Sequence, residues 1–200
     1  MELLLRIILP VYFMLYFFLL FVLKTVIVGK RINKNPLVLP QDDTAYGLVG
    51  LYFKITLLAL ALYTVIFASF PEMHLYFIQL NILNIKWIQF SGLTLLAISF
   101  IWIMIAQYHM KDSWRIGIDQ NDKTELITVG LFSYSRNPVF FGMIISLFGL
   151  FLTTPNVVTL ILFIVGYLMI QIQVRLEEEY LLKAHGNTYI TYQNQTRRYI

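Results

Sequence analysis

The stretch PVFFGMIISLFGLFLTTPNVVTLILFIVGYLMIQIQV, residues 138–174, decides the fold. Two apolar runs, residues 138–154 and 157–174, flank a short joint that contains Pro155. At a rise of 1.5 Å per residue, each run makes a helix of roughly 25 Å, slightly shorter than the hydrocarbon core of a bilayer. So short a joint predicts that the two helices are antiparallel neighbours. We therefore expect a helical hairpin within a membrane, with Thr154 as the cap and Pro155 in the first turn of the second helix.

The composition of the whole chain also indicates a membrane protein. Its 200 residues are 58% hydrophobic and 13% charged, and the mean hydropathy is +0.71. So few polar side chains cannot cover the apolar surface of a domain of this size in water, which excludes a soluble globular fold. The chain contains no cysteine, so disulfides, thiol nucleophiles and cysteine-ligated metals are excluded, and we expect no metal site.

Three further apolar segments precede the hairpin. Residues 3–28, 47–70 and 87–109 are each long enough to cross the hydrocarbon core, which needs about 20 residues. The segment 71–86 is amphipathic and aromatic, which is typical of the membrane interface. We expect an all-α integral membrane protein with about five transmembrane helices and a C-terminal helical hairpin.

Basic residues are unevenly distributed among the connections. Three occur in residues 29–46, four in residues 110–137 and four from Arg175 onward, against only Lys86 in residues 71–86. Excess Lys and Arg marks the cytoplasmic side, so the N-terminus is expected outside and the C-terminus in the cytoplasm. The net charge of +4 therefore indicates membrane orientation rather than a nucleic-acid partner.

Polar residues collect at the ends of the hairpin. Arg136, Asn137 and Pro138 open its first helix, and Glu177 and Glu178 follow its second. Pro138 fits the first turn of a helix, where its missing N–H would have no partner in any case. Because the two helices form a hairpin, we expect these groups to meet on the cytoplasmic face.

The acidic run of residues 177–179 needs its own explanation. Carboxylates at a helix C-terminus oppose the helix dipole, so either the helix continues or a cation lies beside them. Continuation is favoured by the expected pairs Arg175–Glu179 and Glu179–Lys183, and by Gly186 as a stop signal. On this interpretation a solvated acidic face accounts for the run without any site.

A stripe of small residues follows one face of the first hairpin helix. Gly142, Ser146 and Gly149 are spaced by three or four residues, which lets a neighbouring backbone approach closely. We interpret this stripe as a helix-packing surface.

Four motifs follow one another in the C-terminal half of the chain. They are SWR-x-GI (residues 113–118), L-I-T-x-G-x-F (residues 126–132), R-N-P-x-F-x-G (residues 136–142), and Glu177-Glu178 followed by G-x-x-Y-x-x-Y (residues 186–192). In this order and within a membrane hairpin, residues 111–192 resemble the isoprenylcysteine carboxyl methyltransferase and phospholipid methyltransferase superfamily.

The resemblance implies methyl transfer from S-adenosylmethionine to a lipophilic acceptor in the bilayer, with the active site facing the cytoplasm. Prenylated cysteine, phospholipid and small lipophiles are the implied acceptors, and the isoprenylcysteine carboxyl type is favoured. Residues 1–110 would form N-terminal transmembrane helices and residues 111–200 the catalytic region, within one membrane domain. Carried over by position, the cofactor-binding residues are Glu125, Leu126, Ile127, Phe132, Asn137, Pro138, Phe140 and Glu177. We expect the catalytic residues to be Arg136, Arg175 and Glu178.

The chemistry of these residues agrees with the implied roles. A desolvated Glu177 carboxylate would bind the ammonium and sulfonium cations of the cofactor. The aromatic rings of Phe132 and Phe140 can pack against the adenine or against the sulfonium of the cofactor. Arg136 can pair with a carboxylate of the cofactor or of a glutamate. A carboxylate acceptor needs no general base, whereas an amine or thiol acceptor would need one, for which Glu178 and His185 are the candidates.

The chain departs from the superfamily pattern at two positions. Carboxyl methyltransferases have an arginine that holds the substrate carboxylate where this chain has Gln173, with Arg175 two residues later. Phe140 stands where the superfamily commonly has tyrosine, which removes a hydroxyl group.

Two other classes of protein share this hydropathy. A non-catalytic transport or assembly protein would explain the helices but not the paired motifs, and charges within the spans, which transport favours, are nearly lacking here. A membrane reductase with a nicotinamide cofactor would be built on a related scaffold, although the sequence has no glycine-rich phosphate motif.

Overall fold

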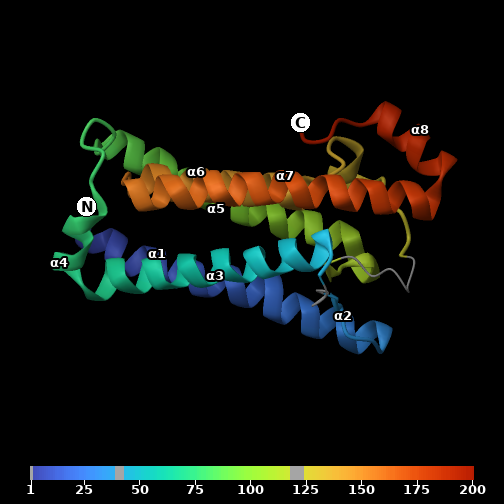
Figure 1. Ribbon diagram of the computed structural model, residues 1–200, viewed down its shortest axis with the longest axis horizontal. Helices are drawn as coiled ribbons and strands as arrows, with labels where there is room; N and C mark the ends of the chain where they lie inside the picture. Colours follow the sequence, from blue (N-terminus) through green and yellow to red (C-terminus); the bar gives the residue numbers. More distant parts are fainter. Residues whose placement is uncertain (1, 39–42, 118–123) are drawn as a thin grey trace.

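Five helical segments run side by side along the long axis of the computed structural model, which describes residues 2–38, 43–117 and 124–200 (Figure 1). The first segment is continuous and includes a π-helical stretch. Two shorter helices, α4 and α8, lie at opposite ends of the bundle (Figure 1). The bounds are α1 Glu2–Phe17, the π-helix Phe18–Leu23, α2 Lys24–Ile32, α3 Ala45–Ser69, α4 Pro71–His74, α5 Lys86–Met110, α6 Pro138–Thr153, α7 Val157–His185 and α8 Asn187–Gln195.

The expected all-α membrane fold is confirmed. Four helical segments are long and apolar enough to cross a membrane: Glu2–Ile32, Ala45–Ser69, Lys86–Ser113 and Val157–His185. Helix α6 is apolar but shorter, with 16 residues. Over the described ranges the sheet content is one parallel pair of two-residue strands, β1 Leu37–Val38 and β2 Ile116–Gly117.

Helices α6 and α7 form the expected hairpin, but a different residue caps the second helix. The side chain of Asn156 accepts a hydrogen bond from Thr159 N at 3.0 Å and donates one to Tyr63 Oη at 2.9 Å. Thr154 instead ends α6, and Pro155 precedes the cap. The predicted cap was therefore wrong, because asparagine satisfies the helix N-terminus and also bonds to α3.

The small-residue stripe of α6 packs against α5, which confirms its interpretation as a packing surface. A Cβ atom added to Gly149 would lie 3.0 Å from Gly92 O, and one added to Gly142 would lie 2.4 Å from Ile103 Cγ1. Ser146 and Ser99 share a hydrogen bond of 2.8 Å across the same interface. Only small residues allow this approach of the two backbones.

Helix α7 continues to His185 and stops at Gly186, which has a φ of 54°. The expected pair of Lys183 with Glu179 is present, with an N–O distance of 2.6 Å. Arg175 does not pair with Glu179 as expected, but donates to the carbonyl and amide oxygens of Gln171 at 2.7 and 3.0 Å. Helical side chains lean toward the N-terminus of their helix, which brings Arg175 over Gln171.

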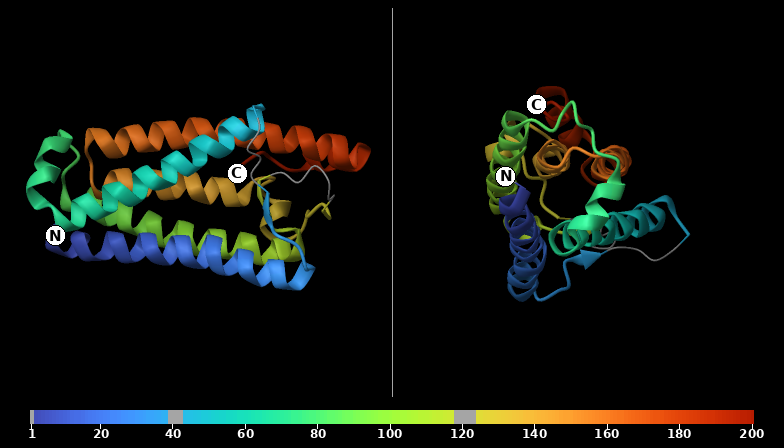
Figure 2. Two further views of the ribbon diagram at one scale, coloured as in Figure 1. Left: turned by 60° about the horizontal axis from the view of Figure 1, so that its bottom comes forward. Right: turned by 90° about the vertical axis from the view of Figure 1, so that its left-hand side faces the viewer.

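The connections rich in basic residues meet at one end of the bundle, opposite the N-terminus and α4 (Figures 1 and 2). This end holds the C-terminus of α5, the start of α6, the C-terminal half of α7 and α8 (Figure 1). The strand pair ties the segment after α2 to the segment after α5, where Ile116 N donates to Pro36 O at 2.9 Å. The predicted site residues are therefore gathered at this end.

Candidate active site

A cavity of about 190 Å³ lies within the bundle, between residues of α1, α3, α6 and α7. A single buried water needs only about 10–15 Å³, so this space is much larger than a packing defect. Along α6 the lining runs from Pro138 to Leu150, roughly 18 Å at 1.5 Å per residue. Beyond its polar end the lining is mainly apolar, with Leu9, Leu60 and Leu96 near Leu150.

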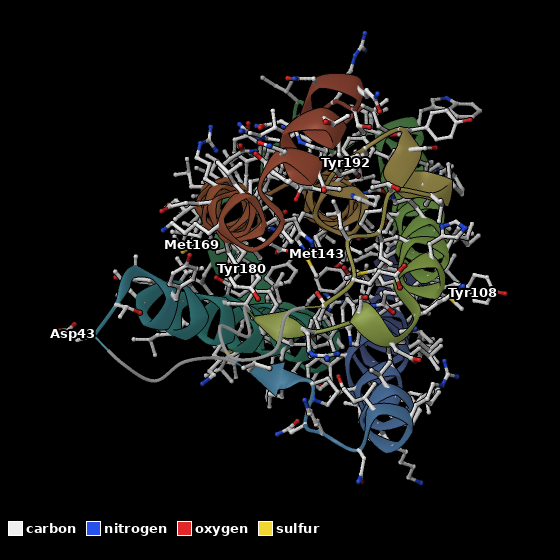
Figure 3. The ribbon with its side chains drawn as sticks, turned by 90° about the vertical axis from the view of Figure 1, so that its right-hand side faces the viewer. Asp43, Tyr108, Met143, Met169, Tyr180 and Tyr192 are labelled. Carbon is white, nitrogen blue, oxygen red and sulfur yellow. The ribbon has the colours of Figure 1, made fainter. Side chains whose placement is uncertain are left out.

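The charged residues of the lining gather at the end of the bundle where α6 begins. Figure 3 looks onto this end, where Met143, which lines the cavity, lies near the centre of the ring of helices. Polar and aromatic side chains share this part of the wall: Arg115, Phe132, Arg136, Asn137, Gln173 and Glu177. The cavity therefore joins a polar mouth to an apolar interior.

The first turn of α6 places Asn137 at this mouth. Pro138 occupies the start of the helix, and its carbonyl accepts a hydrogen bond from Trp102 Nε1 at 2.9 Å. Asn137 has φ −132° and ψ 53°, and its side chain does not cap α6. The amide of Asn137 is consequently available for bonds to other elements.

Glu178 joins this turn to α7 through a buried ion cluster. Its Oε1 accepts from Arg136 Nε at 3.1 Å and from Asn137 Nδ2 at 3.0 Å. Its Oε2 accepts from Arg198 Nε at 3.0 Å and Arg198 Nη2 at 2.8 Å. Glu178 is only 5% exposed. In the folded protein, charge-assisted hydrogen bonds therefore replace the water that would otherwise solvate both carboxylate oxygens. The bonds with Glu178 raise the pKa of the Arg198 guanidinium further above its usual range.

The last turn of α8 and the chain after it lie along the same turn of α6. Arg136 Nη1 donates to Gln193 O at 2.9 Å and to Thr196 O at 2.6 Å, and Arg136 N donates to Arg197 O at 2.9 Å. Ser135 and Arg197 form a parallel β-bridge. Arg136 thus satisfies carbonyls of the C-terminal segment as well as Glu178.

The side chains of Glu177 and Glu178, although adjacent in the chain, lie in different environments. Successive residues of a helix point about 100° apart, so Glu178 reaches the ion cluster while Glu177 lines the cavity. Gln173, one turn earlier on α7, lines the cavity together with Glu177. The half-buried Glu177 therefore places a carboxyl group at the mouth.

Phe132 reaches the cavity from a 3₁₀ turn, Gly130–Ser133, that is held from both sides. Gly130 has a φ of +65°, and an added Cβ atom would lie 2.6 Å from the ring of His109. Leu131 N donates to His109 Nδ1 at 3.3 Å, and Tyr192 Oη donates to Phe132 O at 2.6 Å. Burial raises the pKa of the Tyr192 hydroxyl, so this group remains a neutral donor.

The structure brings most of the predicted site residues together. Six of them line the cavity: Phe132, Arg136, Asn137, Pro138, Phe140 and Glu177. Of the two partners considered for Arg136, the structure shows the glutamate. Ile118 of the first motif lies outside the described residues.

Five predicted residues do not line the cavity. Glu178 faces the ion cluster, and Arg175 is exposed and bonded to Gln171. Residues 125–127 belong to the segment before the 3₁₀ turn, where Glu125 is exposed and its carbonyl accepts from Ser113 Oγ at 3.2 Å.

Two cavity or cluster residues had no assigned role in the sequence. Trp114 lines the cavity, and its indole N–H is buried without a partner among the described residues. Arg198 completes the ion cluster. The SWR-x-GI motif could have singled out Trp114, whereas Arg198 has no local signal that separates it from its neighbour Arg197.

One protein family matches a part of the chain that lines this cavity. The family model for phospholipid methyltransferase matches residues 87–188, about half of the chain, including α5, α6 and α7. No curated protein and no solved structure matches the chain. The match confirms the superfamily predicted from the motifs. The chain thus belongs to the phospholipid methyltransferase family, whose members are membrane methyltransferases.

Proposed function

We propose that this protein transfers a methyl group from S-adenosylmethionine to the carboxylate of a lipophilic acceptor, as an isoprenylcysteine carboxyl methyltransferase does. The observation that carries the proposal is the cavity itself. Its mouth holds the carboxylate of Glu177 beside Asn137, and its interior is apolar over roughly 18 Å of α6.

The residues at the mouth fit the cofactor. S-adenosylmethionine carries an ammonium and a sulfonium cation, and when bound it supplies an electrophilic methyl group. The half-buried Glu177 carboxylate opposes these cations in a poorly hydrated setting, where attraction between charges is strong. Phe132 and Phe140 add aromatic surfaces that attract cations and can stack on adenine.

The position of Glu178 supports a carboxylate as acceptor. An amine or thiol acceptor needs a base to take its proton, and Glu178 was the acidic candidate for that role. Here both of its oxygens are held by guanidinium groups, which makes the carboxylate a poor base. A carboxylate oxygen attacks the methyl carbon directly as the carbon–sulfur bond breaks, so no proton has to move and the cationic sulfur becomes a neutral thioether.

The apolar walls of the cavity would align the acceptor with the cofactor and exclude water from the reacting atoms. A displacement at carbon needs the attacking oxygen, the methyl carbon and the sulfur in line, and binding energy of a lipid tail can hold that alignment. Excluding water from the mouth also protects the charged reactants from solvation. We propose that this mouth faces the cytoplasm, because the basic connections lie at the same end of the bundle.

Two measurements on the purified protein in detergent test the proposal. Calorimetry with S-adenosylmethionine and S-adenosylhomocysteine should give saturable binding, and labelled methyl transfer should favour prenylated cysteines over phosphatidylethanolamine. Transfer to the amine lipid alone would overturn the carboxylate acceptor. Binding of a nicotinamide nucleotide without either adenosyl compound would favour a reductase, and binding of none of them a non-catalytic membrane protein.

A further inference from the structure

We infer that residues 196–199, which we name the C-terminal strap, brace the first turn of α6, and that Arg198 is a positioning residue for Asn137. The inference rests on the proposed function, because its consequence is the orientation of a group that contacts the cofactor. The juxtaposition that carries it links the strap, Glu178 and Asn137 in one hydrogen-bond network.

The network fixes which way the Asn137 amide points. Asn137 Nδ2 donates to Glu178 Oε1 at 3.0 Å and to Arg198 O at 3.2 Å. A carboxylate and a carbonyl can only accept, so both positions require the NH₂ group of the amide. Asn137 lines the cavity, and the group that it retains for a ligand is the acceptor Oδ1.

Arg198 holds Glu178 in the rotamer that makes this possible. Its two bonds, at 3.0 and 2.8 Å, take Glu178 Oε2 and leave Oε1 for Asn137 and Arg136. Arg136 has its own fork of donors and could pair with both oxygens of an unrestrained carboxylate. Without Arg198, Glu178 would turn toward Arg136 and withdraw from Asn137.

The strap itself is anchored by its backbone. Arg136 Nη1 donates to Thr196 O, and Arg136 N donates to Arg197 O. The backbone carbonyl groups before and after Arg197 Cα are therefore both held against the first turn of α6. The ring of Tyr199 lies 6.4 Å from that of Phe141 on α6, measured between ring centroids. The side chain of Arg197 is exposed, whereas that of its neighbour Arg198 is half-buried against Glu178.

The consequence is that two hydrogen-bond acceptors lie at the mouth, beside its arginines. Asn137 Oδ1 and the Glu177 carboxylate both offer oxygen to the cavity. Such a pair favours a ligand that carries an ammonium group or an exocyclic amine, and it discriminates against anionic groups at this position. The strap, though separate from α6 and α7, thus sets the polarity of the site.

The adjacent arginines provide a matched test. Arg198→Gln should weaken binding of S-adenosylhomocysteine by about tenfold in Kd, which corresponds to one lost charge-assisted interaction. Arg197→Gln removes the same charge from the same segment and should bind like wild type. Arg198→Lys keeps one bond to Glu178 and should be intermediate. All four proteins are compared by calorimetry at a temperature where thermal unfolding shows each of them folded.

The outcomes separate this inference from the proposed function. Equal Kd values for Arg198→Gln and wild type would overturn the role of Arg198 and leave the proposed function intact. Equal weakening by Arg197→Gln and Arg198→Gln would also overturn it, since general charge rather than position would then matter. Failure of wild type to bind would overturn both.

Discussion

The carboxylate of Glu178 and the guanidinium of Arg136, 42 residues apart in the chain, meet at 3.1 Å. Their side chains are 6% and 9% exposed, respectively. The hairpin of α6 and α7 brings them together, because it returns the chain to the level at which α6 began. A second guanidinium, from Arg198, completes the pairing of the carboxylate. The ion cluster therefore closes the hairpin at its open end and also forms the back of the cavity mouth.

Replacing Glu178 by glutamine should destabilise the protein strongly. The change removes the negative charge and leaves Arg136 buried without its carboxylate, a loss of about 3 kcal/mol for a broken buried pair. Unfolding in mixed micelles, followed by circular dichroism, measures the difference. Glu179→Gln, one residue further along α7 and exposed, should change stability by no more than about 0.5 kcal/mol. Equal losses for the two variants would contradict the structural role of the cluster.

Much of the fold could be predicted because it follows from local patterns. Hydropathy fixed the helices and the hairpin, and the run of acids before Gly186 correctly indicated that α7 continues beyond the apolar core. The predicted cap failed because the choice of Asn156 depends on Tyr63, a residue of another helix. Helix α8 was not predicted, because its sequence NTYITYQNQ is polar and lacks an apolar helical pattern. Its two tyrosines are buried by tertiary contacts, such as the bond of Tyr192 to the 3₁₀ turn, that the sequence does not reveal.

The motifs singled out several residues that the structure places on one cavity. Asn137 and Glu177 lie on one cavity, as expected for groups at the two ends of a hairpin. The sequence did not predict that Glu177 would line the cavity while Glu178 joined the ion cluster, because this difference depends on the rotation of α7 about its axis. Arg198 lies 20 residues from Glu178, beyond any helical or strand period, and only the path of the strap makes it a partner.

Replacing Glu177 by glutamine should abolish or greatly weaken cofactor binding without a large loss of stability. The side chain keeps its size, but it loses the carboxylate that would oppose the cofactor cations at the cavity. We expect Kd for S-adenosylmethionine to rise at least about tenfold, the loss of one charge-assisted bond. Glu179→Gln is the control for a charge change on the same helix, and wild-type affinity in Glu177→Gln would exclude Glu177 from the site.

Replacing Gly92 by alanine should separate α5 from α6. The added Cβ atom would lie 2.6 Å from Thr153 N and 2.7 Å from Gly149 O, both backbone atoms that cannot rotate away. The strain of such overpacking, about 1–3 kcal/mol, exceeds the gain of about 1 kcal/mol from replacing a helical glycine. Thermal unfolding in detergent measures the balance. Ser91→Ala, at an exposed position on the same helix, should leave the midpoint nearly unchanged.

Stability should fall at alkaline pH through the tyrosines that dock α8, and Tyr192→Phe should reduce that fall. Burial, followed by the nearby Tyr189, raises the pKa of Tyr192 in the folded protein, whereas the unfolded chain loses this proton near pH 10. A raised folded pKa contributes stability that is complete below the unfolded value and is lost as the pH rises above it.

At neutral pH, Tyr192→Phe should cost about 1 kcal/mol, because the hydrogen bond of 2.6 Å to Phe132 O disappears. Above pH 10 the difference from wild type should shrink. Unfolding curves from pH 7 to 11 measure both effects, with the exposed Tyr134→Phe as control, and a difference that grows with pH would contradict the burial of the neutral hydroxyl.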